Sequence, residues 1–348
     1  MADIEQNSAP VRNPVTAHPP VRQMTAVQRF FLSNEFGLIV LIVLFTIIFA
    51  SISPMFLSNF SLYAMGRTAA VNIMIGFSMM VVIVTGGLNL GVGAIGVCGA
   101  MFGGWLMQAA GLHWLPACFG ALIVGALLGA TNGVMIVKSG LHSFIITLAT
   151  MSVMFGAMIF LTQAESFREI SPAFSTLGRM KILAVLSPML LTAIVIGVLL
   201  WLAFKFTTVG REILAAGANA RAAELSGIRV GRMITYAHAL SGVLAVVAGL
   251  MLVSRTGAAI PSMAGQLGQD WLLPAFLGPV LGGNLLTGGR ISVLGTFLGA
   301  FLVTMLTTGL LLMQVGAFWV QTYLGLLLLI AVLLDLARRS YLARNKLV

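Results

Sequence analysis

KFTTVGREILAAGANARAAELSGIRVGR, residues 205–232, is the longest polar interruption in a chain that is otherwise apolar from residue 37 to residue 337. It carries five of the nineteen basic residues, together with Glu212 and Glu224. Within it, Gly217 to Ile228 reads as one short helix. Asn219 is typical of a residue that caps a helix N-terminus, and Gly227 of a left-handed residue that ends a helix. We expect this helix to be the contact site through which another protein moves the rest of the chain.

A helix of about two turns is marginally stable alone in water, so it needs a surface to lie on. A small apolar flank for this purpose is predicted at Ala222, Ala223, Leu225 and Ile228. The residues expected to carry the contact with a partner are Gly217, Asn219, Arg221, Ala222, Ala223, Glu224, Ser226 and Gly227.

The composition predicts an all-α polytopic membrane protein. Of its 348 residues 59% are hydrophobic and only 8% are charged, whereas a soluble domain carries about a quarter charged residues. The net charge of +10 does not require nucleic acid, because the basic residues lie in short loops and tails, where membrane proteins place them. We therefore expect the chain to be surrounded by membrane lipid. Cys98 and Cys118 lie in apolar segments without metal-ligand spacing, so no metal site is predicted.

Apolar runs predict about ten transmembrane helices of roughly 20 residues each, some broken by glycines. The predicted spans are 37–56, 62–85, 90–110, 115–137, 142–163, 182–204, 233–254, 270–286, 291–313 and 317–337. With both termini in the cytoplasm, fourteen basic residues fall inside and five outside, which favours that orientation. The transmembrane domain is then 37–338, with the loop 205–232 inside and the loop 164–181 outside. Residues 1–36 are predicted to be a disordered, Pro-rich cytoplasmic tail and 339–348 a basic cytoplasmic tail.

Two interruptions of the apolar runs look alike. One begins at Gly86-Gly87 with Asn89 nearby, and the other at Gly282-Gly283 with Asn284 next to it. In both, helices with glycines about four residues apart follow. Glycine-broken segments in matching positions of two halves are a pointer to a transport pathway, although glycines four apart also serve close helix packing. The predicted pathway residues are Asn72, Gly86, Gly87, Asn89, Thr147, Gly282, Gly283 and Asn284, with Asn132 as a further polar candidate.

No Asp, Glu, Lys or Arg lies at the middle of a predicted span, which counts against a proton relay or an ion-coupled pump. The outer loop is the second polar feature. It mixes charges with Phe167 and Phe174, and Pro172 is placed to open a short surface helix. We expect a docking surface for an external partner there rather than a merely solvated loop. The expected docking residues are Glu165, Arg168, Glu169 and Arg179.

The sequence carries no catalytic motif that we recognise. It contains no phosphate-binding G-x-x-x-x-G-K-[ST], no G-x-S-x-G and no H-E-x-x-H. The chain is therefore not expected to be an enzyme or to hold a cofactor. If ATP drives it, another subunit must bind ATP with Mg²⁺ and hydrolyse it.

Several stretches together resemble the permease subunits of bacterial ABC importers of the ribose or simple-sugar type. They are TGGLNLGVG (85–93), GALLGATNGVMIVKSGLHSFIITLAT (125–150), GANARAAELSGI (217–228), GGNLLTGGRISVLGTFLGA (282–300) and AVLLD (331–335). The resemblance runs from about residue 60 to residue 337. The chain departs from the family pattern at Asn89, where Asp is usual, and at Gly91, where Ser is usual. Arg221 and Glu224 exchange the usual order of acid and base, so an i,i+3 pair remains with its signs swapped.

The resemblance implies a permease dimer, of one or two kinds of chain, in the bacterial inner membrane. It also implies an ATPase on the cytoplasmic face and a periplasmic binding protein that delivers a pentose- or hexose-like sugar. Two alternatives stay open at this point. The cargo could instead be branched-chain amino acids or nucleosides, or the chain could be a secondary transporter that works alone.

Overall fold

The structure is a computed structural model that describes residues 34–182, 185–316, 319–330 and 333. The predicted tail 339–348 lies outside these residues, as does most of the predicted tail 1–36. Asn34, Glu35 and Phe36, which the sequence assigned to that tail, are already helical. Within the described part the elements are α2 (Asn34–Ile52), η1 (Pro54–Leu57), α3 (Asn59–Ile83), α4 (Val92–Gln108), α5 (Trp114–Ser139), α6 (Ser143–Thr162), α7 (Pro172–Arg179), α8 (Pro188–Phe206), α9 (Thr208–Ala218), α10 (Ala220–Leu225), α11 (Val230–Thr256), η2 (Gln266–Trp271), α12 (Leu272–Leu281), α13 (Val293–Leu312) and a helix over Trp319–Ile330.

Seven of the described helices are long and apolar enough to cross a bilayer: α2, α3, α5, α6, α8, α11 and α13. The chain is thus a multi-pass helical membrane protein. α4 has 17 residues and the helix Trp319–Ile330 is shorter still. The predicted span 270–286 is wrong in extent, because α12 has only 10 residues and is about 15 Å long, half of the ~30 Å hydrocarbon core. The total of ten spans stays a prediction.

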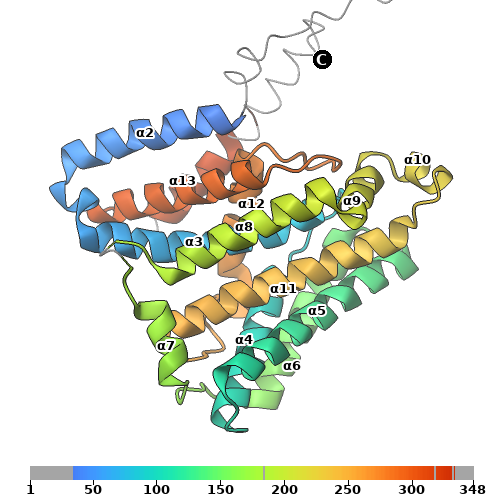
Figure 1. The fold of residues 1–348 in the computed structure, drawn as a ribbon, viewed down its shortest axis with the longest axis horizontal. Coiled ribbons are helices and arrows are strands. Elements are labelled where there is room, and N and C mark those ends of the chain that lie inside the picture. Colours follow the sequence, from blue (N-terminus) through green and yellow to red (C-terminus); the bar gives the residue numbers. More distant parts are fainter. Residues whose placement is uncertain (1–33, 183–184, 317–318, 331–332, 334–348) are drawn as a thin grey trace, which may run out of the picture.

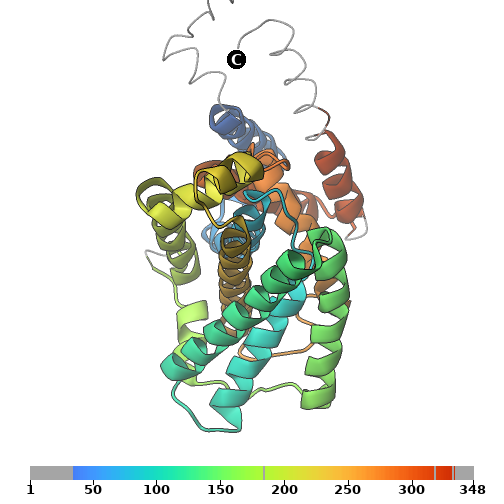
Figure 2. The same cartoon turned by 90° about the vertical axis from the view of Figure 1, so that its right-hand side faces the viewer.

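The long helices lie side by side and run between two ends of the molecule (Figure 1). α7 lies at one end, and α9 with α10 at the other, which faces the viewer in Figure 2. α3 and α11 form the centre, since both are mostly buried and they pack against each other. α2 packs on α13 and leaves most of its apolar side chains exposed, as expected for a lipid-facing helix.

Glycines bring α5 and α11 into very close contact. A Cβ on Gly125, Gly129 or Gly133 of α5 would collide with the α11 backbone around His238 and Gly242. The glycines that follow the two breaks also pack closely, on Trp271 and Val246 in the first case and on the α12 backbone in the second. The packing interpretation of these spaced glycines is therefore confirmed, as small residues permit such approach in membranes.

Candidate functional site

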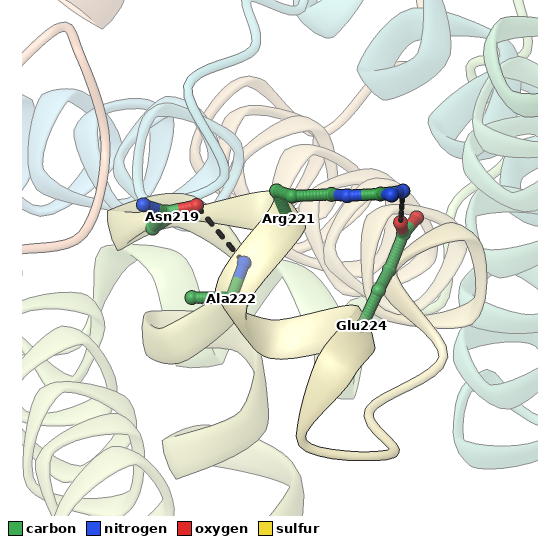
Figure 3. Close-up of polar contacts among 4 residues, drawn as sticks. All are labelled: Asn219, Arg221, Ala222 and Glu224. Atoms are coloured by element: carbon green, nitrogen blue, oxygen red, sulfur yellow. Dashed lines mark hydrogen bonds and ion pairs between the residues drawn. The ribbon is translucent and has the colours of Figure 1, made fainter. Parts of the chain in front are cut away.

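The predicted short helix exists as α10, and local chemistry fixes both of its ends. At its start, Asn219 Oδ1 accepts a hydrogen bond from the Ala222 N–H at 3.0 Å (Figure 3). At its end, the N–H of Gly227 bonds Glu224 O and the N–H of Ile228 bonds Ala223 O, while Gly227 has a φ of +84°. This is a Schellman ending, which needs a left-handed residue. Both predicted caps are confirmed.

The predicted extent of this helix is corrected in one respect. Gly217 and Ala218 are not its first residues, because they form the last turn of the preceding helix α9. Two helices therefore meet at the extended residue Asn219, which has a φ of −158°. Asn219 marks this boundary in the sequence, because a residue that caps the N-terminus of a helix lies before its first turn.

α10 is largely open to solvent. Ala223 is buried and Ile228 packs beside it, as predicted for the apolar flank. Ala222 and Leu225, which were predicted to share that flank, are exposed, and Leu225 is 79% exposed. Leu225 is therefore the large apolar side chain that α10 presents outward.

Arg221 and Glu224 form the predicted i,i+3 ion pair (Figure 3). Their charged groups are 3.8 Å apart, and the side chains are 83% and 54% exposed. An exposed pair of this kind contributes at most about 1 kcal/mol to folding. Both charges are therefore free to exchange this contact for one with a partner.

The first break, between α3 and α4, is held by polar side chains. Asn89 is fully buried, and its Oδ1 accepts from the Gly91 N–H while its Nδ2 donates to Ser241 Oγ, both at 3.0 Å. Thr147 Oγ1 accepts from the Leu90 N–H at 3.1 Å. The backbone amides freed by the break thus find partners inside the protein, as a membrane interior demands.

The second break, between α12 and α13, is also held by a buried asparagine. Asn284 Nδ2 donates to Pro279 O at 2.9 Å and to Thr296 Oγ1 at 2.8 Å, and its Oδ1 accepts from the Ser292 N–H at 2.7 Å. The left-handed glycines here are Gly283, Gly288 and Gly289. Each break therefore has a buried asparagine that bonds its backbone, but the turns differ, because Asn89 bonds Gly91 two residues on and Asn284 bonds Ser292 eight residues on.

Asn72 is in a different position from these two asparagines. It lies half-buried on α3 and donates to Thr304 Oγ1 of α13 at 2.9 Å. Its environment is the most open of the three. A role of these residues in a translocation pathway stays a prediction.

The two breaks touch each other, and the end of α9 touches both. The Gly289 N–H donates to Val84 O at 2.8 Å. A Cβ on Gly86 would lie 3.3 Å from Thr287 O, and one on Gly217 would collide with Val84 O. Sequence analysis identified the glycines but missed Val84 and this meeting point, because residues so far apart in sequence carry no local signal of contact. The helix that leads into α10 therefore rests on both interruptions of the membrane segments.

A cleft of about 580 Å³ lies next to α10, between the end of α5 and the start of α11. Its walls combine the apolar Val134, Val137 and Ile228 with the charged Lys138 and Arg232. Protein-binding sites commonly combine apolar and charged residues in this way. Sequence analysis did not single out Lys138 or Arg232 as site residues.

At the opposite end, α7 is the surface helix predicted to begin at Pro172. Phe167 and Phe174 are buried and anchor the loop, and Phe174 stacks on Trp114 at 6.0 Å between ring centroids. The predicted docking residues Glu165, Arg168, Glu169 and Arg179 are all exposed. Arg179 also donates to the backbone oxygens of Arg255 and Thr256.

Four basic residues lie near one another at this end, and two of them place their side chains over the Tyr63 ring. Arg67 and Lys181 lie 5.3 Å and 5.1 Å from the centre of its ring, and the Tyr63 hydroxyl donates to Arg179 O. Arg255 joins them through Arg67, which donates to its carbonyl. Among the described residues none of the four is in an ion pair with a carboxylate. We call Arg67, Arg179, Lys181 and Arg255 the outer basic cluster.

The chain matches known transport permeases over most of its length. Residues 61–334 match the family described as the permease component of the branched-chain amino acid transport system. The ribose import permease RbsC of Bacillus subtilis (strain 168) is 35% identical over 302 residues, which cover 86% of this chain and 90% of that protein. RbsC of Escherichia coli (strain K12) is 32% identical, covering 90% and 98%. The D-allose permease AlsC of E. coli (strain K12) is 30% identical, covering 87% and 91%.

No solved structure matches the chain. The family match covers far more than half of the 348 residues, and it includes both glycine breaks and α10. The relatives are covered almost from end to end. The chain therefore belongs to this family of membrane permease components of transport systems, together with the ribose and allose import permeases.

Proposed function

We propose that the chain is the permease subunit of an ABC importer that carries a pentose- or hexose-like sugar across the bacterial inner membrane. The observation that carries this proposal is the contact between Gly217 at the end of α9 and the two breaks at Val84 and Gly289. An exposed helix that is connected to the interruptions of the membrane segments can transmit a displacement imposed by a cytoplasmic partner. The distribution of the basic residues supports an orientation with α10 and both termini inside.

The partner that pushes is proposed to be a separate ATPase, which holds ATP and Mg²⁺. Its closure would move α10 and the adjoining α9 as a rigid unit. Because Gly217 leaves no room between α9 and Val84, the displacement passes to the breaks and changes how α3, α4, α12 and α13 meet. Such bistable repacking of helices is a common way of converting a small push into a change of access.

A sugar is the cargo that the relatives favour. The curated relatives named above import ribose and D-allose, and a fructose import permease, FrcC of Rhizobium meliloti, is 31% identical over 291 residues. The family description names branched-chain amino acids. The relatives that span nearly the whole chain are nevertheless named for sugars, so amino acids and nucleosides rank second. Selectivity would reside mainly in the protein that delivers the sugar.

The outer face is proposed to receive that periplasmic binding protein. The loop 164–181 offers Glu165, Arg168 and Glu169 in exposed positions, and the outer basic cluster lies beside it. Two copies of the permease, or this chain with a second permease, would form the complete pore.

The test is reconstitution in proteoliposomes with the ATPase and the binding protein that copurify with the chain. Labelled ribose, allose and fructose are compared with leucine and a nucleoside. We expect uptake of one sugar only when ATP is present on the ATPase side and the binding protein on the other. Uptake that proceeds equally well without ATP would show a stand-alone transporter, and uptake of leucine or the nucleoside alone would contradict the sugar assignment.

A further inference from the structure

Two adjoining hollows lie between α8 and α13. The first is an apolar groove of about 460 Å³, lined among others by Phe77, Ile194, Val198 and Phe297. The second is a polar pocket of about 360 Å³, lined among others by Glu35 and Lys205. We call them the α8–α13 groove and the head pocket. Both are bordered by Trp201, Val293 and Leu294, so one hollow continues into the other.

The head pocket presents one negative and one positive group. Glu35 Oε1 accepts a hydrogen bond from Ser292 Oγ at 2.8 Å, which fixes the carboxylate on the pocket wall. Lys205 Nζ lies over the Trp201 ring, 4.6 Å from its centre. The two groups are not paired with each other, since the ion pair found among the described residues is Arg221 with Glu224. Each therefore retains its attraction for an opposite charge supplied from outside the chain.

The depth of the two hollows fits one leaflet of a bilayer. Lys205 begins the polar loop, so the head pocket lies at the membrane surface. Trp201 lies one turn deeper, at the level where membrane proteins concentrate aromatic rings. From Lys205 to Ile194 the α8 helix rises about 16 Å at ~1.5 Å per residue, close to half of a ~30 Å hydrocarbon core.

From this arrangement we infer that the α8–α13 groove and the head pocket bind one phospholipid of the cytoplasmic leaflet with an ammonium-bearing, zwitterionic headgroup. Its ammonium group faces Glu35, its phosphate faces Lys205, and one acyl chain lies in the α8–α13 groove. An anionic lipid would satisfy Lys205 but would leave Glu35 without a cation. The head pocket also contacts Leu214 of α9, so a bound headgroup lies against the helix that leads into α10. This inference does not depend on the cargo or on the ATPase.

Lipid retention by the full-length chain tests it. The chain is placed in nanodiscs of equal parts phosphatidylethanolamine and phosphatidylglycerol with identical acyl chains, and the lipids that survive gentle detergent extraction are counted by native mass spectrometry. The groove variant is Val198→Trp and its matched control is Val195→Trp, because both valines lie on α8 with 50% and 56% exposure but only Val198 lines the groove. Headgroup variants are Glu35→Gln and Lys205→Gln, with Lys205→Arg as the conservative control.

We expect the unmodified chain to retain phosphatidylethanolamine in preference to phosphatidylglycerol. Val198→Trp should lower that retention at least about fivefold while Val195→Trp leaves it unchanged. Glu35→Gln should remove the preference for one lipid over the other. Lys205→Gln should lower the retention of both lipids, whereas Lys205→Arg should leave the retention of both unchanged. The inference is wrong if the unmodified chain retains neither lipid, if it retains both equally, or if the two tryptophan variants behave alike. It is also wrong if Val198→Trp leaves the lipid in place and instead separates paired permease chains, because the α8–α13 groove would then be an interface between copies.

Discussion

The backbone N–H of Gly289 donates a hydrogen bond to the carbonyl oxygen of Val84, 2.8 Å away. This single bond joins two loops that interrupt different membrane segments. Gly217 closes the arrangement from the end of the molecule that carries α10, because its Cα lies where any side chain would strike the same Val84 carbonyl. The contact connects α9, and through it α10, to the interruptions of the membrane segments.

Gly217→Ala should uncouple transport. Alanine favours a helix over glycine by about 0.5–1 kcal/mol, so the collision with the Val84 backbone is the dominant adverse effect. We expect ATP-driven uptake to fall about tenfold, as a shift of 1–2 kcal/mol in a coupling free energy would produce. The control is Gly156→Ala on α6, where a Cβ meets no atom within 4 Å. Equal uptake by the two variants would contradict the role of this contact.

Gly227→Val should impair coupling through backbone strain alone. The residue has a φ of +84° and a Cβ there meets no atom within 4 Å, so crowding is not involved. A β-branched residue in this conformation costs about 1–2 kcal/mol and would melt the Schellman ending. We expect uptake to be lost while ATP hydrolysis continues without transport. The variant should still be found in the membrane fraction, and after extraction it should elute normally from a size-exclusion column. Gly227→Asn, which tolerates the conformation, should keep most activity. If valine performs as well as asparagine, α10 does not act as a rigid lever.

The ends of α10 could be predicted from sequence because capping is local. Asn219 and Gly227 bond groups within a few residues of themselves, so their types and spacing suffice. The meeting of Val84, Gly217 and Gly289 could not be predicted, since it joins three distant segments through backbone atoms that any residue possesses. The shortness of α12 was missed for another reason. Hydropathy registers apolar content, but it does not register that α12 ends at Leu281, before Gly282 and the left-handed Gly283, inside the predicted span 270–286.

Exchanging the charges of Arg221 and Glu224 should change partner recognition without changing stability. The pair is exposed, so the double variant Arg221→Glu/Glu224→Arg should alter the free energy of unfolding by no more than about 0.5 kcal/mol. Retention of the ATPase in a pull-down should fall, because the surface of the ATPase would be complementary to the native order of the two charges. The matched control exchanges Glu165 and Arg168 at the opposite end. A double variant that retains the ATPase as well as the native chain does would show that charge order is irrelevant to the contact.

Asn284→Ala and Asn72→Ala should separate a structural role from a pathway role. Asn284 is 4% exposed and makes three hydrogen bonds, whereas Asn72 is half-buried and makes one to Thr304. Leaving buried partners unsatisfied costs about 1–3 kcal/mol, so Asn284→Ala should lower Tm clearly. Asn72→Ala should lower uptake with little change in Tm. A large loss of Tm with Asn72→Ala, or none with Asn284→Ala, would reverse these assignments.

Lys181→Gln should weaken docking of the periplasmic binding protein. The outer basic cluster holds four cations with no carboxylate partner among the described residues, so an acidic surface on the incoming protein is the counterpart it favours. Attraction between exposed charges is screened beyond ~10 Å at about 0.1 M salt, so affinity measured by surface plasmon resonance should decline as salt rises. The variant should bind about three- to tenfold more weakly at low salt and show a shallower salt dependence.

The control is Arg211→Gln on α9, which lowers the net charge by the same amount at the opposite end and should leave binding unaltered. Salt-independent affinity of the native chain, or equal losses in the two variants, would mean that the cluster does not contact the binding protein.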